Sequence, residues 1–385
     1  MHKITFFPLG NADCCRLDTS AGKKFLFDYA NMRCPDDKAD KRIDLPAELK
    51  ADLKASKRDG YDVVGFTHLD EDHVCGAPEF FHFEHAAKYQ TEGRAKIAEM
   101  WVPAAVILED RPDGDAGVVQ AEARYRLLNK RGIRVFSRPD RLREWMKKQG
   151  GNSDDYKSCL TDAGQLVPGF SLLLDGIEFF VHSPFAERCD EKTVIDRNDA
   201  SLVLQVRFAG GYPQTDLILS ADTTHEIWQS IVKVTKYHKC EDRLRWNIFK
   251  LPHHCSYLAL GPEKGKEKTK PVDEVKWLYE EQSAEGCYVV STSDPIPTKD
   301  TDQPPHRQAA SYYKGVMADR DGEFVVTMET PSVAAPKPAV FEIGDDGLTF
   351  APDSEAKKSS NLAAAVVAAR GNPAPPAQRV GFGRA

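Results

Sequence analysis

The first part of the chain alternates short apolar runs with turn residues. Apolar side chains dominate residues 4–8, 14–18 and 24–28, and the separators are Gly10-Asn11-Ala12-Asp13 and Ser20-Ala21-Gly22. Short runs bounded by Gly, Asn, Asp and Ser are typical of β-strands joined by tight turns. The pattern therefore predicts paired strands at the start of the chain.

Further along, predicted strands alternate with polar helical segments. A polar helix is predicted for residues 46–59, and an apolar strand follows at residues 61–67. This alternation predicts an α/β fold in which loops at strand ends carry the functional site. The remaining strands are predicted by apolar runs at residues 170–174, 177–182, 201–208, 217–220, 246–251 and 288–291.

Two segments differ in composition from the rest. Residues from about 80 to 165 are rich in Arg, Lys and Glu, and amphipathic helices are predicted at residues 120–131 and 141–148. From residue 331 the composition shifts towards Ala, Pro and Ser, which predicts a flexible tail. We therefore expect one folded domain at residues 1–330, with a helical insertion at about 80–165, and a C-terminal tail at residues 331–385.

Composition and charge narrow the class of protein. The 385 residues carry a formal net charge of −7, so a nucleic-acid substrate would need a local basic patch or bound metal ions. Nine cysteines occur without a CxxC pair, which predicts reduced thiols rather than disulfides. The chain starts directly in a predicted strand, without a signal-peptide pattern, and lacks the roughly 18 uninterrupted apolar residues of a membrane span. We expect a cytoplasmic protein without a membrane partner.

A dense polar cluster follows the strand at residues 61–67. The segment His68-Leu69-Asp70-Glu71-Asp72-His73 presents two imidazoles and three carboxylates within six residues. So much negative charge at a strand end is unfavourable unless a cation neutralises it, and these ligand types suit zinc, manganese or iron. For an isolated string of this kind, the alternative is a solvated acidic turn with unrelated histidines.

Two other predicted strands end in the same kinds of side chain. Asp222 follows the strand at residues 217–220, and His253 and His254 follow the strand at residues 246–251. Sites of α/β sheets lie at the carboxyl ends of strands. Three such endings favour a shared metal site over a chance arrangement.

This series of motifs resembles that of the metallo-β-lactamase superfamily. The strongest resemblance is to the soluble hydrolase domain of ComEC-type DNA-uptake proteins and its stand-alone relatives, which carry Asp where most of the superfamily has its middle histidine, as at Asp70. The chain departs from them at Ala30 and Cys255, where they have Gly. The third histidine of the superfamily has no clear counterpart, and His182 is the nearest candidate. The other matching segments are residues 8–13, 26–30, 198–204, 217–222 and 250–256 and Pro305-His306.

The resemblance implies a four-layer αββα metallo-β-lactamase sandwich with its metals at one edge. The implied cofactors are one or two divalent ions, zinc or manganese. It also implies the ligands: Asp72, His73 and His254 at one metal position, Asp222 bridging, and His68 and Asp70 at the other position, with His182 as a further candidate.

Hydrolysis by metal-activated water is the chemistry that such a centre implies. Asp72 would act at the metal, and His306 would donate a proton or contact phosphate, although a surface histidine is the alternative. His253 faces away from His254 if that segment is extended, as a supporting residue or simply a buried one. Two carboxylates are candidates for orienting a ligand histidine, or are ordinary turn residues: Asp13 and Asp28.

The favoured function is hydrolysis of a phosphodiester, with a nucleic acid or a nucleotide as substrate. The resemblance and the Asp-rich site both favour it, because such a site suits hard cations that bind phosphate oxygens. One alternative is a hydrolase of lactones, thioesters or β-lactams. Another is a catalytically idle metal-binding module in a larger defence or DNA-processing assembly, and a protein partner or a homo-oligomer stays open.

Overall fold

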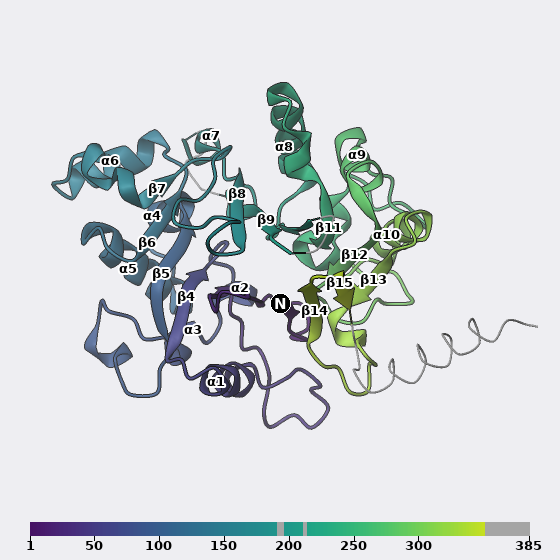
Figure 1. Ribbon diagram of the computed structural model, residues 1–385, viewed down its shortest axis with the longest axis horizontal. Coiled ribbons are helices and arrows are strands. Elements are labelled where there is room, and N and C mark those ends of the chain that lie inside the picture. Colours follow the sequence, from purple (N-terminus) through teal and green to yellow (C-terminus); the bar gives the residue numbers. More distant parts are fainter. Residues whose placement is uncertain (191–195, 211–213, 351–385) are drawn as a thin grey trace, which may run out of the picture.

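The computed structural model describes residues 1–190, 196–210 and 214–350, and Figure 1 shows its two β-sheets between flanking helices. Nine strands form the first sheet, in the spatial order β15-β14-β1-β2-β3-β4-β5-β6-β7. Six strands form the second sheet, in the order β13-β12-β11-β10-β9-β8. The first sheet contains β1 (His2–Phe6), β2 (Cys15–Asp18), β3 (Lys24–Phe27), β4 (Gly60–Gly65), β5 (Lys96–Pro103), β6 (Ile133–Phe136), β7 (Leu160–Thr161), β14 (Ala339–Gly344) and β15 (Gly347–Phe350). The second contains β8 (Ile177–Ser183), β9 (Val203–Phe208), β10 (Thr215–Leu219), β11 (Trp246–Lys250), β12 (Ser283–Ser291) and β13 (Glu323–Val326).

The α-helices pack mainly on the outer faces of these sheets. They are α1 (Leu45–Ala55), α2 (Glu71–Val74), α3 (Ala77–Phe80), α4 (Ala104–Leu108), α5 (Gly114–Leu128), α6 (Asp140–Lys148), α7 (Ala186–Asp190), α8 (His225–His238), α9 (Asp273–Glu280) and α10 (Arg307–Asp319). Short 3₁₀ helices are η1 (Ala87–Tyr89), η2 (Ser153–Cys159), η3 (Glu241–Leu244), η4 (Pro252–Cys255), η5 (Tyr257–Ala259) and η6 (Thr327–Glu329).

Apolar side chains fill the space between the two sheets. Phe6, Phe25 and Trp101 of the first sheet belong to the same buried cluster as Phe179 and Leu217 of the second. A second cluster packs α1, α5 and α6 on the outer face of the first sheet, and a third packs α8, α9 and α10 on the second sheet. The structure thus confirms the predicted four-layer αββα sandwich.

Residues 80–165 are an integral part of the first sheet rather than a helical insertion. The predicted helices at residues 120–131 and 141–148 correspond to α5 and α6, but β5, β6 and β7 lie around them and extend the sheet by parallel pairing. The charged composition concealed these strands. In β5, for example, Lys96 is exposed and Glu99 half-buried, while the run from Met100 to Pro103 is buried throughout.

Residues 339–350 correct the predicted start of the tail at residue 331. β14 pairs antiparallel with β1, and β15 pairs with β14. Phe341, Ile343 and Phe350 join the cluster between the sheets, and burial of these side chains holds the hairpin in place. Residues 351–385 of the predicted tail lie outside the described residues.

The prediction of a strand at residues 170–174 is wrong. This segment runs into a turn in which the Ser171 N–H donates to Asp175 Oδ2 over 2.9 Å. Leu173 and Leu174 are 92% and 80% exposed, so the apolar run that predicted the strand is not buried there.

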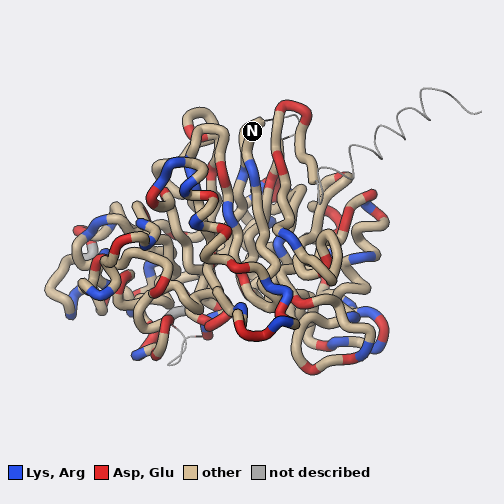
Figure 2. Tube along the Cα trace, turned by 90° about the horizontal axis from the view of Figure 1, so that it is seen from below, with Lys and Arg blue, Asp and Glu red and all other residues tan. Residues whose placement is uncertain are grey.

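Lys and Arg are interspersed with Asp and Glu over the molecule, as Figure 2 shows. The cysteine side chains that the structure describes are free thiols, as predicted. Among the described residues, no helix combines the length and the apolar character needed to cross a membrane.

Backbone hydrogen bonds between loops hold one edge of the sandwich together. The N–H of Asp13, after β1, donates to the carbonyl of Asp72 over 2.9 Å. The N–H of Leu202, just before β9 of the second sheet, donates to the carbonyl of Thr67, after β4 of the first, over 3.1 Å. These bonds fix the loop after β4 against both sheets, at the edge where β10 and β11 also end.

Candidate metal centre

Loops from both sheets deliver polar side chains to a buried centre at this edge. The loops after β4, β10 and β11 carry the residues that the sequence predicts, and the loops after β1 and β3 add two carboxylates. Most of these side chains are almost completely buried, so the charges of the group lie in a region of low dielectric constant. The residues, in chain order, are Asp13, Asp28, His68, Asp70, Asp72, His73, Asp222 and His254.

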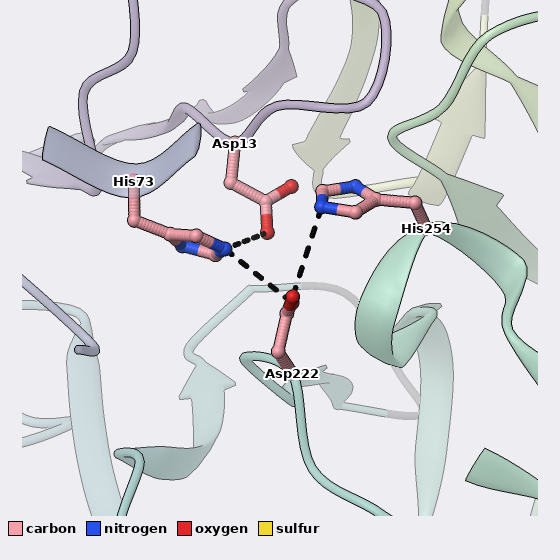
Figure 3. Close-up of side chains that lie close together, drawn as sticks. All are labelled: Asp13, His73, Asp222 and His254. Atoms are coloured by element: carbon pink, nitrogen blue, oxygen red, sulfur yellow. Dashed lines mark ion pairs between the residues drawn. The ribbon is translucent and has the colours of Figure 1, made fainter. Parts of the chain in front are cut away.

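Four of these side chains point towards one another, as Figure 3 shows: Asp13, His73, Asp222 and His254. One ligand-type atom from each lies within 4.8 Å of the others, and all four residues are buried. Nε2 of His73 lies 3.4 Å from Oδ1 of Asp222, and Nε2 of His254 lies 3.7 Å from Oδ2 of Asp222. Asp72 reaches the same group, with Oδ2 at 2.9 Å from Nε2 of His254. The structure therefore brings together Asp72, His73, Asp222 and His254, as predicted.

Each histidine of the centre has its Nδ1 atom held by a protein acceptor. Nδ1 of His73 lies 2.9 Å from Oδ2 of Asp28, and Nδ1 of His254 lies 2.7 Å from the carbonyl of Thr292. Nδ1 of His68 lies 3.1 Å from the hydroxyl of Thr67, which itself lies 2.8 Å from Oδ2 of Asp28. A proton on Nδ1 leaves Nε2 as the free lone pair, which is the arrangement found in histidines that bind metals.

Opposite charges in the centre shift the pKa values of His73 and Asp222 in favour of their charged forms. Burial disfavours the imidazolium, but Asp28 and Asp222 outweigh it and raise the pKa of His73 well above its usual value. Burial also opposes ionisation of Asp222, but the neighbouring His73 and His254 hold the pKa of this carboxyl well below its usual value. The imidazoles thus retain protons where no other cation balances the carboxylates.

These observations fit a divalent metal ion. Nε2 of His73 and Nε2 of His68 are buried and have no hydrogen-bond partner among the described residues. Mixed imidazole and carboxylate ligands suit zinc and manganese, and a bound dication would replace the protons that now balance the negative charge. Asp72, His73, Asp222 and His254 are the residues that could hold such an ion.

The backbone around the centre is unusual. Five non-glycine residues have a left-handed conformation there: Asp28 (φ 58°), Ala221 (47°), His253 (48°), His254 (51°) and Cys255 (66°). Each such residue costs roughly 1–3 kcal/mol, and strain of this kind clusters at functional sites. The segment after β11 is therefore a tight turn, so the extended conformation on which the opposite orientation of its two histidines depended is not present.

Lys250, the last residue of β11, lies beneath the centre and was not predicted. Its ammonium donates to Oδ2 of Asp13 and lies 3.7 Å from Oδ1 of Asp222. It also donates to the carbonyl of Ala221 over 3.2 Å. Burial disfavours the ammonium, but Asp13 and Asp222 outweigh it and raise the pKa of Lys250. Asp13, which the sequence offered as an orienting residue, is thus paired with a buried cation as well as facing His73.

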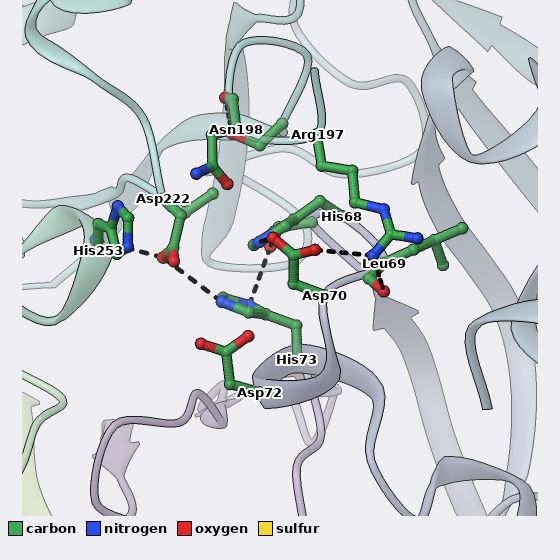
Figure 4. A network of polar contacts seen from close by, with 12 residues as sticks. His68, Leu69, Asp70, Asp72, His73, Arg197, Asn198, Asp222 and His253 are labelled. Carbon is green, nitrogen blue, oxygen red and sulfur yellow. Dashed lines mark hydrogen bonds and ion pairs between the residues drawn. The ribbon is translucent and has the colours of Figure 1, made fainter. Parts of the chain in front are cut away.

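His68 and Asp70 lie at the other side of the centre (Figure 4). The His68 and His73 rings are 3.9 Å apart between centroids, and Nε2 of His68 lies 3.3 Å from Oδ2 of Asp70. Oδ1 of Asp70 accepts a hydrogen bond from Arg197 over 2.7 Å. Oδ1 of Asn198 is buried without a hydrogen-bond partner among the described residues. Arg197 was not expected as a site residue, whereas Asn198 begins the matching segment 198–204 of the sequence.

The structure places the two predicted catalytic histidines beside the turn. The His253 N–H donates to Oδ1 of Asp222 over 3.2 Å, so the backbone of this residue supports the Asp222 carboxylate. The rings of His306 and Tyr257 meet edge to face, with their centroids 4.9 Å apart, and Nδ1 of His306 accepts from the Tyr257 N–H over 3.4 Å. The His306 N–H donates to the carbonyl of Cys255 over 3.1 Å. A catalytic role for either imidazole stays a prediction.

His182 lies apart from the centre. It follows Val181, which packs between the sheets, and its own side chain faces the opposite side of β8. There its Nε2 lies 2.8 Å from the carbonyl of Arg243, within a cavity of about 1000 Å³ next to α7 and α8. The structure thus separates this candidate ligand from the other predicted ligands.

The position of His182 gives a pH-dependent stability. Burial lowers the pKa of His182 from 6.5 to about 4. Between these values the unfolded chain binds a proton that the folded chain does not, so stability falls as the pH is lowered from about 6.5 towards 4. At pH 5 we expect this histidine to reduce the free energy of unfolding by up to about 2 kcal/mol. Urea unfolding of the wild type and of His182→Gln at pH 7 and pH 5 tests this. The glutamine keeps a donor for the Arg243 carbonyl but does not titrate. The variant should therefore lose less stability between pH 7 and pH 5 than the wild type. An equal loss in both proteins would contradict the assignment.

Asp28 gives a second test of the centre. Asp28→Asn keeps the shape of the side chain and tolerates the left-handed backbone, but it removes the charged acceptor of His73 Nδ1. We expect ~10–100-fold weaker binding of zinc or manganese, the usual effect of losing such an orienting carboxylate. A competition titration with a chelating dye measures this, with the exposed residue Asp319→Asn as control. An affinity within twofold of the wild type would mean that Asp28 does not orient the ligand.

Comparisons with known proteins leave the family open. Neither a protein-family model nor a curated protein matches the chain. Similar solved structures include unliganded yeast PDE1, which is 11% identical with a TM-score of 0.42, covering 84% of this chain and 97% of that one. They also include Zn²⁺-bound PqqB from Methylobacterium extorquens, which is 9% identical with a TM-score of 0.41, covering 89% of this chain and 100% of that one. A third is the metallo-β-lactamase GOB-18 from Elizabethkingia meningoseptica, which is 10% identical with a TM-score of 0.31, covering 82% of this chain and 89% of that one. The account of the site rests on its own side chains.

Proposed function

We propose that this chain is a metal-dependent hydrolase, and specifically a phosphodiesterase or nuclease. The observation that carries the proposal is the buried group of Asp13, His73, Asp222 and His254. The histidines of this group have their Nδ1 atoms held and their Nε2 atoms turned towards the carboxylates. Such a group is expensive to bury without a cation.

Different residues of the centre would have different roles in the reaction. Asp72, His73 and His254 would hold the ion, and Asp222 faces both histidines. When bound, a zinc or manganese ion supplies a water of lowered pKa and positive charge to offset that of the substrate oxygens. Asp28 and Thr292 hold the imidazoles in orientation, and Lys250 pairs with Asp13 and lies beside Asp222.

The proposed substrate is a phosphodiester in a nucleic acid or a nucleotide. A centre with more carboxylates than imidazoles favours hard cations that also bind phosphate oxygens. The motif series that resembles ComEC-type hydrolase domains supports the same substrate class, and a close relationship to those domains is part of the proposal.

Hydrolysis of bis-p-nitrophenyl phosphate tests the proposal. Metal-stripped protein is refilled with manganese or zinc, and wild type is compared with Asp72→Ala and His254→Ala. The matched control is His238→Ala, because His238 is an exposed histidine on α8. We expect turnover that depends on metal, disappears in both site variants and persists in the control. Bound metal without turnover of this ester, of DNA, of RNA or of cyclic nucleotides would overturn the proposal, and lactone or thioester substrates would then be tested.

A further inference from the structure

The two sides of the candidate centre differ in charge. On the side of His73 and His254, the carboxylates of Asp13, Asp72 and Asp222 lie close together, and Lys250 contacts two of them. On the side of His68, the carboxylate of Asp70 already has a cation of the chain itself beside it. An added dication therefore meets more carboxylates on the first side than on the second.

Arg197 is the cation beside Asp70. Its Nη1 donates to Oδ1 of Asp70 over 2.7 Å and to the carbonyl of Leu69 over 3.0 Å. Its Nε lies 3.0 Å from Oε2 of Glu109, the residue after α4, and Nη2 donates to Oε1 of the same carboxylate. All three nitrogens of the guanidinium thus bond to the protein, which fixes Arg197 in position. Figure 4 shows its contact with Asp70.

This arrangement changes what the His68 side can bind. Oδ1 of Asp70 is taken by Arg197, and only Oδ2 faces Nε2 of His68, at 3.3 Å. Nε2 of His68 and Oδ1 of Asn198 are buried without hydrogen-bond partners among the described residues, so atoms that could bind a metal ion are present there. The Arg197 guanidinium pairs with Glu109 as well as with Asp70, so its charge is shared, and its Nη1 occupies the Asp70 oxygen that a second dication would need.

We propose that Arg197 takes the place of a second metal ion, so that the chain binds one divalent ion tightly, on the side of His73 and His254. The inference rests on the metal centre of the proposed function and goes beyond it in fixing the number of tightly bound ions. In the opposite interpretation, Arg197 merely orients Asp70 as a ligand for a second ion. The two interpretations predict different stoichiometries.

Isothermal titration of the metal-free full chain with zinc, checked by native mass spectrometry, separates them. For the wild type we expect one tightly bound ion, with any second ion binding at least ~100-fold more weakly. In Arg197→Met, Asp70 loses its cation, and we expect the second ion to bind at least ~10-fold more tightly than in the wild type. The double variant Arg197→Met with Asp70→Asn should lose this gain.

Glu109→Gln is the matched control for disturbing the loop. It weakens the same set of hydrogen bonds but leaves the positive charge of Arg197 beside Asp70, so it should show no gain of a second ion. A gain equal to that of Arg197→Met would attribute the effect to loop disturbance and overturn the inference. Two ions of affinities within tenfold in the wild type would also overturn it, and this result does not depend on the folding of any variant.

The titration also separates this inference from the proposed function. One tightly bound ion in a protein that hydrolyses no phosphodiester leaves the inference intact and removes the function. Two equivalent ions in a protein that hydrolyses phosphodiesters would support the proposed function and overturn the inference. No zinc binding at all would overturn both.

Discussion

Asp222→Asn is expected to reduce the metal-dependent hydrolysis of bis-p-nitrophenyl phosphate by at least ~10²-fold. The substitution keeps the size of the side chain but removes the negative charge that faces Nε2 of both His73 and His254. The same carboxylate accepts the N–H of His253 and lies beside Lys250, so its loss also loosens the turn after β11.

The measurement is kcat and KM with saturating manganese, together with the dissociation constant of the metal. Both the turnover and the metal affinity should fall, while Asp319→Asn, an exposed carboxylate on α10, should match the wild type. The unfolding midpoint of Asp222→Asn, measured by circular dichroism, shows that the variant is folded. A folded Asp222→Asn that retains more than a tenth of the wild-type turnover would contradict the role given to Asp222.

Lys250→Met is expected to destabilise the metal-free protein by about 3–5 kcal/mol, the usual effect of removing one partner of a buried ion pair. Lys250 and Asp13 are 5% and 4% exposed, and the substitution leaves the Asp13 carboxylate buried without its cation. A bound dication would supply the missing positive charge, so saturating zinc should recover part of the lost stability.

Urea unfolding with and without zinc measures this effect, and Lys54→Met, at an exposed position of α1, is the control. If the effect comes from the uncompensated charge, Lys250→Met combined with Asp13→Asn should be more stable than Lys250→Met alone. A loss below about 1 kcal/mol, the range of exposed ion pairs, would contradict the account of Lys250 as a buried counter-charge.

The sequence predicted those parts of the centre that carry a local signal. Asp222 and His254 stand directly after apolar runs, and the segment from His68 to His73 is too rich in charge to be an ordinary strand end. Such patterns depend on neighbouring residues, so they are visible without the fold. They identified three loops that the structure brings to one edge.

Lys250 and Arg197 carry no comparable signal. A lysine at the end of a strand is usually exposed, and only the packing of β11 against the loop after β1 shows that Lys250 is buried beside Asp13. Arg197 meets Asp70 across 127 positions of the sequence. Their roles depend on long-range contacts, and a single sequence does not reveal these.

Position on a strand explains the outcome for His182. His182 was a candidate ligand because of its place in the order of motifs along the chain. Side chains alternate along β8, however, and Val181 points into the space between the sheets, so the next residue, His182, points the other way. The strands β5 to β7 and the hairpin β14–β15 were missed for a different reason. Their apolar runs are short and lie within charged or Ala- and Pro-rich sequence, so pairing with the rest of the sheet decides their structure.

The most direct test of the metal centre is an anomalous difference map from crystals of the full chain soaked in zinc and measured at the zinc absorption edge. The account predicts a peak at about 2.0–2.2 Å from side-chain atoms of Asp72, His73, Asp222 and His254. It also predicts that this peak is the strongest in the map and is absent from crystals of His254→Ala. A map from fully soaked wild-type crystals without a peak among these four residues would contradict the central claim that they bind a metal ion.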